Sequence, residues 1–208
     1  MNPIQLLLVE DHLLMREGLL SLLRKKSDIV VTAQAANVQE ALEILASQPV
    51  DIVVTDIGLD QCNGIDLIRE GRRIRPESRF IVLTAYRSPL AVAEAFKAGA
   101  AAYLLKDDAF TLLSDVILRV ASGETGIISN RLPREEIARS VALSARERAV
   151  LQFVATGLSN KEIGNVMHLS IKTVETYRLR LMEKLGVHKC TELVREAFLA
   201  GFAGHVSG

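Results

Sequence analysis

The sequence of 208 residues contains no tryptophan, and aromatic residues make up only 4% of it. Because 49% of the residues are hydrophobic, aliphatic side chains must build the core. Cysteine is scarce as well: only Cys62 and Cys190 occur, and their separation matches no zinc-site spacing. We therefore expect two free thiols in a reducing cytoplasm.

Long apolar runs are also missing. No stretch approaches the roughly 20 residues that a membrane-spanning helix requires, and residues 1–5 lack the positively charged region of a signal peptide. Internal repeats and low-complexity segments are absent too. We therefore expect a cytoplasmic protein without a membrane partner.

The formal net charge is zero, but the charges are distributed unevenly along the chain. Residues 1–125 carry 13 Lys and Arg against 17 Asp and Glu, which gives −4. Residues 138–208 carry 10 against 6, which gives +4. The C-terminal part is therefore the candidate for contact with a polyanion.

Four short runs rich in Val, Ile and Leu each end on a residue suited to phosphate chemistry. Residues 6–9 precede Glu10 and Asp11, residues 52–55 precede Asp56, residues 80–83 precede Thr84, and residues 102–105 precede Lys106. Such runs predict strands buried on both faces, and a further strand is predicted over 29–33. Helical periodicity between them predicts a parallel sheet covered by helices over the first 122 residues. The four endings would then meet at the carboxyl edge of one sheet.

Glu10, Asp11 and Asp56 would repel one another at this edge unless a cation lay between them. Oxygen ligands favour Mg²⁺. Asp56 is the best candidate for a nucleophile, because it stands alone after the central strand. Asp11 would bind the metal directly, Glu10 directly or through water, and the backbone carbonyl of Gly58 could complete the set.

Lys106 would pair with phosphoryl oxygens, and the Thr84 hydroxyl could donate a hydrogen bond to them. Each residue alone has a simpler explanation, since Asp11 or Thr84 could cap a helix and Lys106 could be a solvated loop lysine. Their joint placement at four strand ends favours a phosphoryl-transfer site.

Residues 4–121 resemble the receiver domain of two-component response regulators. The resemblance rests on Glu10-Asp11, Asp56, Gly64, Thr84, Tyr103 and Lys106. It implies a flavodoxin-like α/β fold, in which a doubly wound five-stranded parallel sheet has the order 2-1-3-4-5. It also implies that Asp56 accepts a phosphoryl group from a sensor histidine kinase, after which Thr84 moves toward that group and Tyr103 rotates inward.

Two positions depart from the family pattern. Asp60 stands where a proline often follows the acceptor, which would add negative charge and free the loop. Asp107 stands where a proline often follows the lysine.

The chain predicts a linker over 123–140, because Gly123, Gly126, Asn130 and Pro133 interrupt any periodicity. A short helix could form at its end. From Leu143 the pattern becomes purely helical. The predicted domains are therefore residues 1–122, the linker, and residues 141–208.

Two capping boxes open helices at Ser144 and Ser159, and Ser170 caps a longer helix that runs to about Leu185. Two helices around the tight turn at Leu169-Ser170 describe a helix-turn-helix whose second helix fits the major groove of DNA. On periodicity alone, an ordinary four-helix packing unit explains the pattern equally well.

Residues 143–200 resemble the four-helix output domain of the NarL/FixJ regulators, which carry a LuxR-type helix-turn-helix. The matching runs are Leu143 to Glu147, Gly157 to Ile163, Thr173 to Glu175 and Lys184 to Val187. The resemblance implies that Lys161, Lys172, Thr173 and Lys184 hold phosphates and that Glu175, Thr176 and Leu179 face bases, with Arg180 on the same exposed face. Cys190 stands where relatives often have an arginine, and the resemblance implies that one contact with the DNA backbone is lost.

In this family the last helix dimerises. Leu193, Val194 and Ala197 could supply that face, although core packing is an equal explanation. Together, the two domains predict a phosphorylation-controlled transcription factor and not an enzyme. Its expected partners are a sensor kinase, promoter DNA, RNA polymerase and a second copy of the chain.

Three alternative functions explain the sequence less well. The complete pocket argues against a regulator that is never phosphorylated. An aspartyl-phosphate phosphatase or phosphotransferase typically needs a second Asp two residues after the first, where this chain has Gly58. A nucleotide-binding fold would place a glycine-rich loop after residues 6–9, and none follows.

Overall fold

The computed structural model describes residues 3–59, 62–140 and 143–202. The chain divides into two compact units, one of residues 1–87 and 95–132, the other of residues 133–208 with the segment 88–94. Each unit has its own aliphatic core. Across the described ranges, every helix is too short or too polar to span a membrane.

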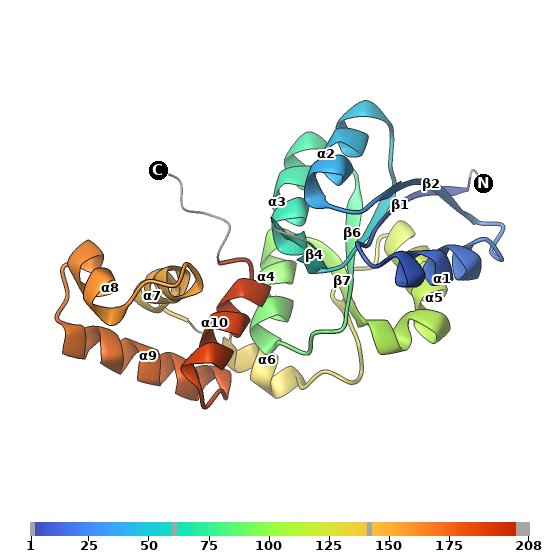
Figure 1. The fold of residues 1–208 in the computed structure, drawn as a ribbon. Coiled ribbons are helices and arrows are strands. Elements are labelled where there is room, and N and C mark those ends of the chain that lie inside the picture. Colours follow the sequence, from blue (N-terminus) through green and yellow to red (C-terminus); the bar gives the residue numbers. More distant parts are fainter. Residues whose placement is uncertain (1–2, 60–61, 141–142, 203–208) are drawn as a thin grey trace. The chain divides into compact units, whose positions relative to one another are not determined.

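The N-terminal unit is built around a parallel sheet whose strands alternate with helices (Figure 1). Its main strands are β1 (Ile4–Val9), β2 (Ile29–Ala35), β3 (Ile52–Thr55), β6 (Arg79–Thr84) and β7 (Ala100–Leu105). The helices that follow these strands are α1 (Leu13–Leu23), α2 (Val38–Ser47), α3 (Gly64–Ile74), α4 (Pro89–Ala98) and α5 (Ala109–Ala121). Residues 89–94 of α4 belong to the other unit. The spatial order β2-β1-β3-β6-β7 confirms the predicted doubly wound sheet.

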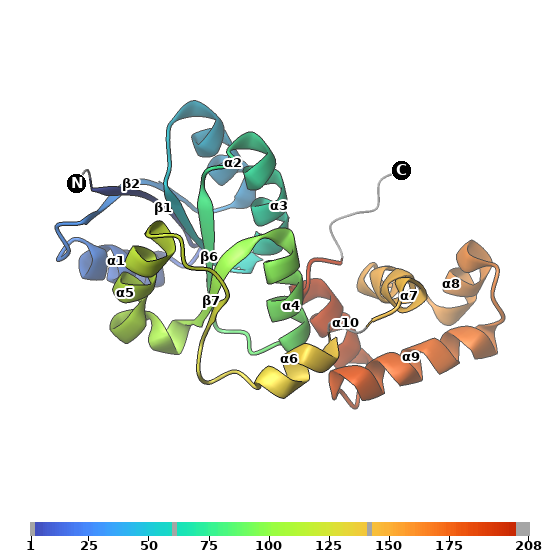
Figure 2. The same ribbon diagram turned by 180° about the vertical axis from the view of Figure 1, so that it is seen from behind.

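Alternating side chains of the strands serve the two faces of this sheet. Leu6 and Leu8 of β1 join the cluster that α1 and α5 bury. On the opposite face, a Cβ atom added to Gly71 of α3 would lie 2.7 Å from the Phe80 ring and 3.0 Å from Leu45 of α2. The absence of a side chain there lets α2 and α3 approach the sheet closely, as the two views show (Figures 1 and 2).

A small antiparallel pair, β4 (Gly58–Leu59) and β5 (Cys62–Asn63), follows β3. Asp60, at which the sequence departs from the family pattern, lies outside the described residues. The chain then returns at Gly64, whose amide donates to the carbonyl of Ile57 over 2.9 Å. A Cβ atom on Gly64 would lie 2.0 Å from the Asp56 carbonyl oxygen, so the loop closes against the end of β3 only with glycine.

A sixth strand, β8 (Ile127–Ile128), pairs in parallel with β7 inside the segment predicted as a linker. The amide of Ser129 donates to the Tyr103 carbonyl at 3.0 Å, and its hydroxyl donates to the buried carboxylate of Asp108. Arg131 pairs with the same carboxylate at 3.1 Å. Residues 127–131, here called the β8 strap, are thus attached to the edge of the sheet. The predicted short helix follows as α6 (Arg134–Ser140).

The C-terminal unit contains α7 (Ala145–Ala155), α8 (Asn160–Met167), α9 (Ile171–Leu185) and α10 (Cys190–Leu199). Both predicted capping boxes form, at Ser144 and Ser159, and Ser170 caps α9. The turn between α8 and α9 is tight, because His168 is left-handed at φ 55°. A Cβ atom on Gly164 would lie 2.8 Å from the Leu169 carbonyl oxygen, so glycine is needed where α8 meets the turn.

An ion pair between an exposed lysine and a buried glutamate joins α7 to α9. Lys184 Nζ lies 2.7 Å from Oε1 of Glu147, a residue that is only 5% exposed. Burial opposes ionisation of this carboxyl group, but hydrogen bonds from Lys184 and Ser144 outweigh it and hold the pKa of Glu147 below its ordinary value. The same carboxylate therefore closes the capping box and fixes the end of α9.

Substitution of Ser129 by alanine should loosen the β8 strap, because the buried Asp108 carboxylate loses a hydrogen-bond donor. We expect the N-terminal unit to lose about 1–3 kcal/mol of stability and the backbone amide of residue 129 to exchange faster with solvent. Urea unfolding and hydrogen exchange measure the two effects. The control is Ser122→Ala, which removes an exposed hydroxyl bonded to the Arg119 carbonyl. Equal stability and exchange in wild type and Ser129→Ala would contradict the attachment.

Acid should destabilise the C-terminal unit through Glu147. The pKa of Glu147 is lower in the folded than in the unfolded state, so its ionised carboxylate stabilises the fold. This stabilisation is complete above the unfolded pKa of about 4.3 and is lost as the pH falls through the folded pKa. The Glu147→Gln variant should lose about 1–3 kcal/mol at neutral pH and show a shallower decline in acid. Thermal unfolding between neutral and acidic pH tests this, with exposed Glu183→Gln as the control. If the stability of Glu147→Gln fell as steeply with pH as that of the wild type, other carboxylates would cause the acid destabilisation.

Candidate functional site

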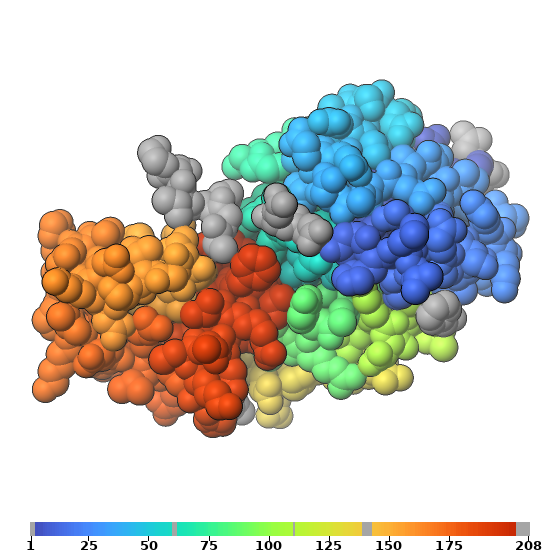
Figure 3. Space-filling model, viewed as in Figure 1, coloured from blue at the N-terminus to red at the C-terminus, as the bar shows by residue number. Residues whose placement is uncertain are grey.

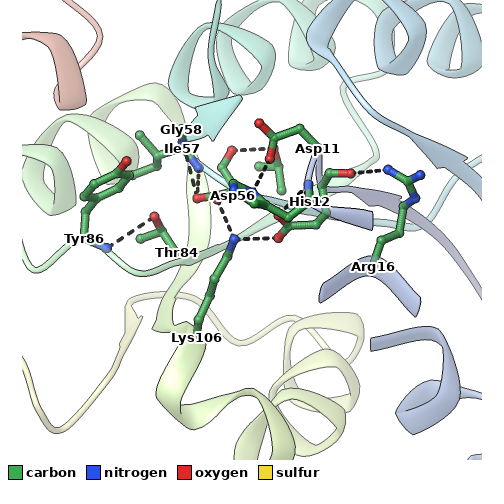
Figure 4. A network of polar contacts seen from close by, with 11 residues as sticks. Asp11, His12, Arg16, Asp56, Ile57, Gly58, Thr84, Tyr86 and Lys106 are labelled. Atoms are coloured by element: carbon green, nitrogen blue, oxygen red, sulfur yellow. Dashed lines mark hydrogen bonds and ion pairs between the residues drawn. The ribbon is translucent and has the colours of Figure 1, made fainter. Parts of the chain in front are cut away.

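The strand register brings the predicted residues to one edge of the sheet. Val9 of β1 is level with Thr55 of β3, and Thr84 of β6 with Leu105 of β7. Glu10, Asp56 and Lys106 follow directly after β1, β3 and β7. Figure 4 shows the side chains of Asp56 and Lys106 pointing toward each other.

Lys106 bridges two buried carboxylates at this edge. Its Nζ lies 2.7 Å from Oε2 of Glu10 and 2.7 Å from Oδ2 of Asp56, residues that are 1% and 4% exposed. Burial would lower the pKa of Lys106, but the hydrogen bonds to Asp56 and Glu10 outweigh it and hold that pKa above its ordinary value. The lysine is therefore charged at neutral pH.

The second oxygen of Asp56 is held by the backbone. Oδ1 accepts hydrogen bonds from the amides of Ile57 at 2.6 Å and Gly58 at 3.3 Å. With one oxygen on these amides and the other on Lys106, the carboxylate has a fixed orientation. A group bonded to Oδ2 would meet the lysine ammonium directly.

Asp11 lies beside this bridge but is more exposed, and it contacts a residue that sequence reasoning did not select. His12 Nδ1 lies 2.7 Å from Asp11 Oδ1 and 3.2 Å from Glu10 Oε1. The hydrogen bond and negative charge of Asp11 raise the pKa of His12 above its ordinary value. A polar residue just before a helix usually indicates a cap, so the sequence carried no signal of this contact.

The donor set fits a hard divalent cation. Two carboxylates, those of Glu10 and Asp56, share the single ammonium of Lys106, and the carboxylate of Asp11 lies next to them beside His12. Ligand oxygens of Glu10 and Asp11 and a ring nitrogen of His12 lie within 4.8 Å of one another. Carboxylate oxygens are the ligands that Mg²⁺ prefers, and Gly58, whose carbonyl was predicted to help, lies at the same rim.

Thr84 and Tyr103 are both fully buried. The Tyr103 hydroxyl donates to the Tyr86 carbonyl at 3.0 Å, so its ring already points inward. The Thr84 hydroxyl accepts from the Tyr86 amide at 3.4 Å. Tyr86, which the sequence analysis missed, thus connects both predicted switch residues, and its ring would lie 2.9 Å from a Cβ atom on Gly58.

Asp107, the second departure from the family pattern, takes part in an ion pair on the surface. Its carboxylate lies 2.9 Å from Arg87, and both side chains are more than half exposed. An exposed pair of this kind contributes at most about 1 kcal/mol. It therefore adds little to the stability of the pocket.

In the C-terminal unit, α9 forms part of the surface (Figure 3), and most of its predicted polar face is exposed. Lys172, Glu175, Thr176, Leu179 and Arg180 are exposed, and Thr173 is half-buried. A hollow of about 280 Å³ on this face is lined by Ser170, Lys172, Thr173, Thr176, Tyr177 and Arg180. Lys161 at the start of α8 is also exposed.

Other predicted residues of this unit have partners within it. Lys184 is bound to Glu147, and Arg178 of the same helix is half-buried and donates to Asn160 Oδ1 at 2.9 Å. Leu193 and Ala197 are fully buried in the core, whereas Val194 is half-buried. In this conformation only Val194, of the three residues expected to dimerise, offers surface to a second copy.

Two family models match the chain, one on each unit. Residues 6–117 match the response regulator receiver domain, and residues 141–197 match the luxR family of bacterial regulatory proteins. Receiver domains typically bind Mg²⁺, in keeping with the donor set at the edge of the sheet.

Relatives match both units at once. The chain is 33% identical over 199 residues to the DNA-binding transcriptional activator DevR/DosR of Mycobacterium tuberculosis, covering 91% of each. It is 33% identical over 191 residues to the transcriptional regulatory protein UhpA of Escherichia coli, covering 92% of this chain and 96% of UhpA.

Among solved structures, the fold is similar to that of RcsB from Salmonella enterica serovar Typhimurium, solved on promoter DNA with a phosphomimetic. The TM-score is 0.76 at 24% identity, over 95% of this chain and 99% of RcsB. This likeness shows the fold. With both family models and these relatives covering nearly the whole chain, the protein belongs to the NarL/FixJ family of two-component response regulators, transcription factors that join a receiver to a LuxR-type DNA-binding helix-turn-helix.

Proposed function

We propose that Asp56 is the phosphoacceptor of this response regulator and that its phosphorylation controls binding of promoter DNA by α9. The observation that carries the proposal is the bridge from Lys106 to Asp56 and Glu10, 2.7 Å on each side. A buried carboxylate held between two backbone amides and an ammonium is oriented for attack on phosphorus.

The donor is a phosphohistidine on a sensor histidine kinase. Oδ2 of Asp56 forms the new P–O bond while the P–N bond to the histidine breaks, and the electron pair of that bond returns to the imidazole, which takes up a proton from solvent. Lys106 then pairs with a phosphoryl oxygen in place of the carboxylate. Glu10, Asp11, Asp56 and the Gly58 carbonyl would hold Mg²⁺, which would neutralise charge at the phosphoryl oxygens when bound.

The added charge must be accommodated by the residues around the bridge. Thr84 is buried next to the acceptor strand, and its hydroxyl can turn to donate to a phosphoryl oxygen. That turn releases the Tyr86 amide, whose neighbouring carbonyl holds the Tyr103 hydroxyl. Because β7 also carries the β8 strap, a shift at Tyr103 reaches residues 127–131 directly.

On the DNA side, the basic residues Lys161 and Lys172 hold phosphates together with Thr173, and Glu175, Thr176, Leu179 and Arg180 meet base edges. Lys184 is left out of this set, because a phosphate contact would require it to release the buried Glu147. Phosphorylation favours a dimer through the exposed part of α10 at Val194, so that two half-sites are bound at once. The protein acts in the cytoplasm, together with RNA polymerase.

The phosphoacceptor is tested with intact-mass measurements after incubation with acetyl phosphate. The wild-type chain should gain a single phosphoryl adduct that depends on Mg²⁺ and is lost with EDTA, and Asp56→Asn should gain none. Asp107→Asn, which alters an exposed carboxylate nearby, is the matched control and should behave as wild type. An adduct on Asp56→Asn, or none on the wild type at saturating Mg²⁺, would refute the assignment.

The DNA face is tested by the salt dependence of binding to a short duplex of mixed sequence. Lys172→Gln should weaken binding and reduce the slope of log K against log salt by about 1, because one phosphate contact is lost. Lys26→Gln changes an exposed lysine of the N-terminal unit and should leave the slope unchanged. Fluorescence anisotropy gives both values. An unaltered slope for Lys172→Gln would place the DNA contact elsewhere.

A further inference from the structure

Arg16 lies on α1, close to the pocket, and makes a contact that the phosphotransfer chemistry leaves unexplained. Its Nη1 donates to the backbone carbonyl of Glu10 at 2.6 Å. The side chain is half-buried, and it extends from α1 toward the pocket (Figure 4). We propose that Arg16 is a positioning residue for the metal ligands of the pocket; this inference rests on the proposed function.

The peptide between Glu10 and Asp11 is where the chain leaves the sheet. On one side, the Glu10 amide is still bound to the sheet, since it donates to the Ala35 carbonyl at 3.1 Å. On the other side, α1 begins only at Leu13, and its first turn is closed by the Arg16 amide, which donates to the His12 carbonyl at 3.0 Å. The Glu10 carbonyl is accordingly bound by a side chain, that of Arg16.

The peptide unit is planar, so an anchored carbonyl oxygen also fixes the direction of the following N–Cα bond. Here that bond belongs to Asp11, whose carboxylate is one of the predicted ligands. A charged donor at 2.6 Å is stronger and more directional than a neutral one. Arg16 thus limits where the Asp11 carboxylate can point, while Lys106 fixes Glu10 and Asp56.

His12 is the other candidate for this role, because its ring contacts both acidic residues. Its side chain, however, is 72% exposed, and a hydrogen bond in solvent competes with water. Arg16 acts on the backbone from a half-buried position, through a charged donor at 2.6 Å. It is therefore the better-placed of the two to organise the ligands before a metal arrives.

Arginine rather than lysine suits this position, because the guanidinium is planar and can reach the carbonyl while its remaining donors stay solvated. Its guanidinium binds the backbone carbonyl of Glu10, so this contact leaves the carboxylate oxygens of the pocket available to a cation. Arg16 therefore orients the metal ligands without binding the metal itself.

The test is Mg²⁺ binding by the full-length chain without any phosphodonor, measured by calorimetry for wild type, Arg16→Gln, Arg16→Lys and the control Arg24→Gln. Arg24 is the exposed C-cap residue of the same helix. Removing an outer partner of a metal ligand weakens binding about 10–100-fold, and we expect a loss of about 10-fold for Arg16→Gln. Arg16→Lys should restore part of the affinity, and Arg24→Gln should bind as wild type.

Phosphorylation by acetyl phosphate provides the second readout. The Mg²⁺ concentration for half-maximal rate should rise with the Kd in Arg16→Gln, whereas the rate at saturating Mg²⁺ should stay within about twofold of wild type. A Kd equal to that of wild type would overturn the proposal, as would a lowered melting temperature and maximal rate without a change in Kd. A wild-type chain that binds no Mg²⁺ would overturn the proposed function as well.

Discussion

The contact on which the N-terminal unit depends is the bridge of Lys106 between Glu10 and Asp56. It holds two carboxylates that are almost completely buried, and buried charges are tolerated only when they are paired. The bridge also ties together the ends of β1, β3 and β7, which no turn connects. Because one ammonium balances these carboxylates, a negative charge added at the bridge changes the contacts of Lys106. A phosphorylation switch requires this sensitivity to added charge.

The consequences of a change at the bridge follow the covalent chain. Lys106 begins a short 3₁₀ turn that ends at Asp108, and the Asp108 carboxylate holds Ser129 and Arg131 of the β8 strap. One strand earlier in the chain, Thr84 and Tyr86 lie beside Tyr103. The acceptor pocket and the segment that leads to the C-terminal unit therefore share β7 as a common support.

The sequence was sufficient to predict elements whose position depends on neighbouring residues alone. Runs of Val, Ile and Leu located the five main strands, and Ser144, Ser159 and Ser170 located three helix starts, because burial and capping leave direct marks on the sequence. It failed where a residue acts through a contact far along the chain. A strand of two residues such as β8 has no periodicity to detect, and Tyr86 and Arg16 look like ordinary loop and helix residues until the sheet brings their partners near.

The two lysines of α9 show the same limit most sharply. Lys172 and Lys184 are twelve residues apart, which places them about 120° apart around the helix. Lys172 lines the exposed hollow, whereas Lys184 turns toward α7 and neutralises Glu147. Both occur in a motif that suggests phosphate contacts, and only the position of a carboxylate 37 residues away separates their roles. One lysine of this helix thus holds α7 and α9 together, and the other lies on the exposed face for which we propose contact with DNA. The first contact keeps rigid the helix that presents the second.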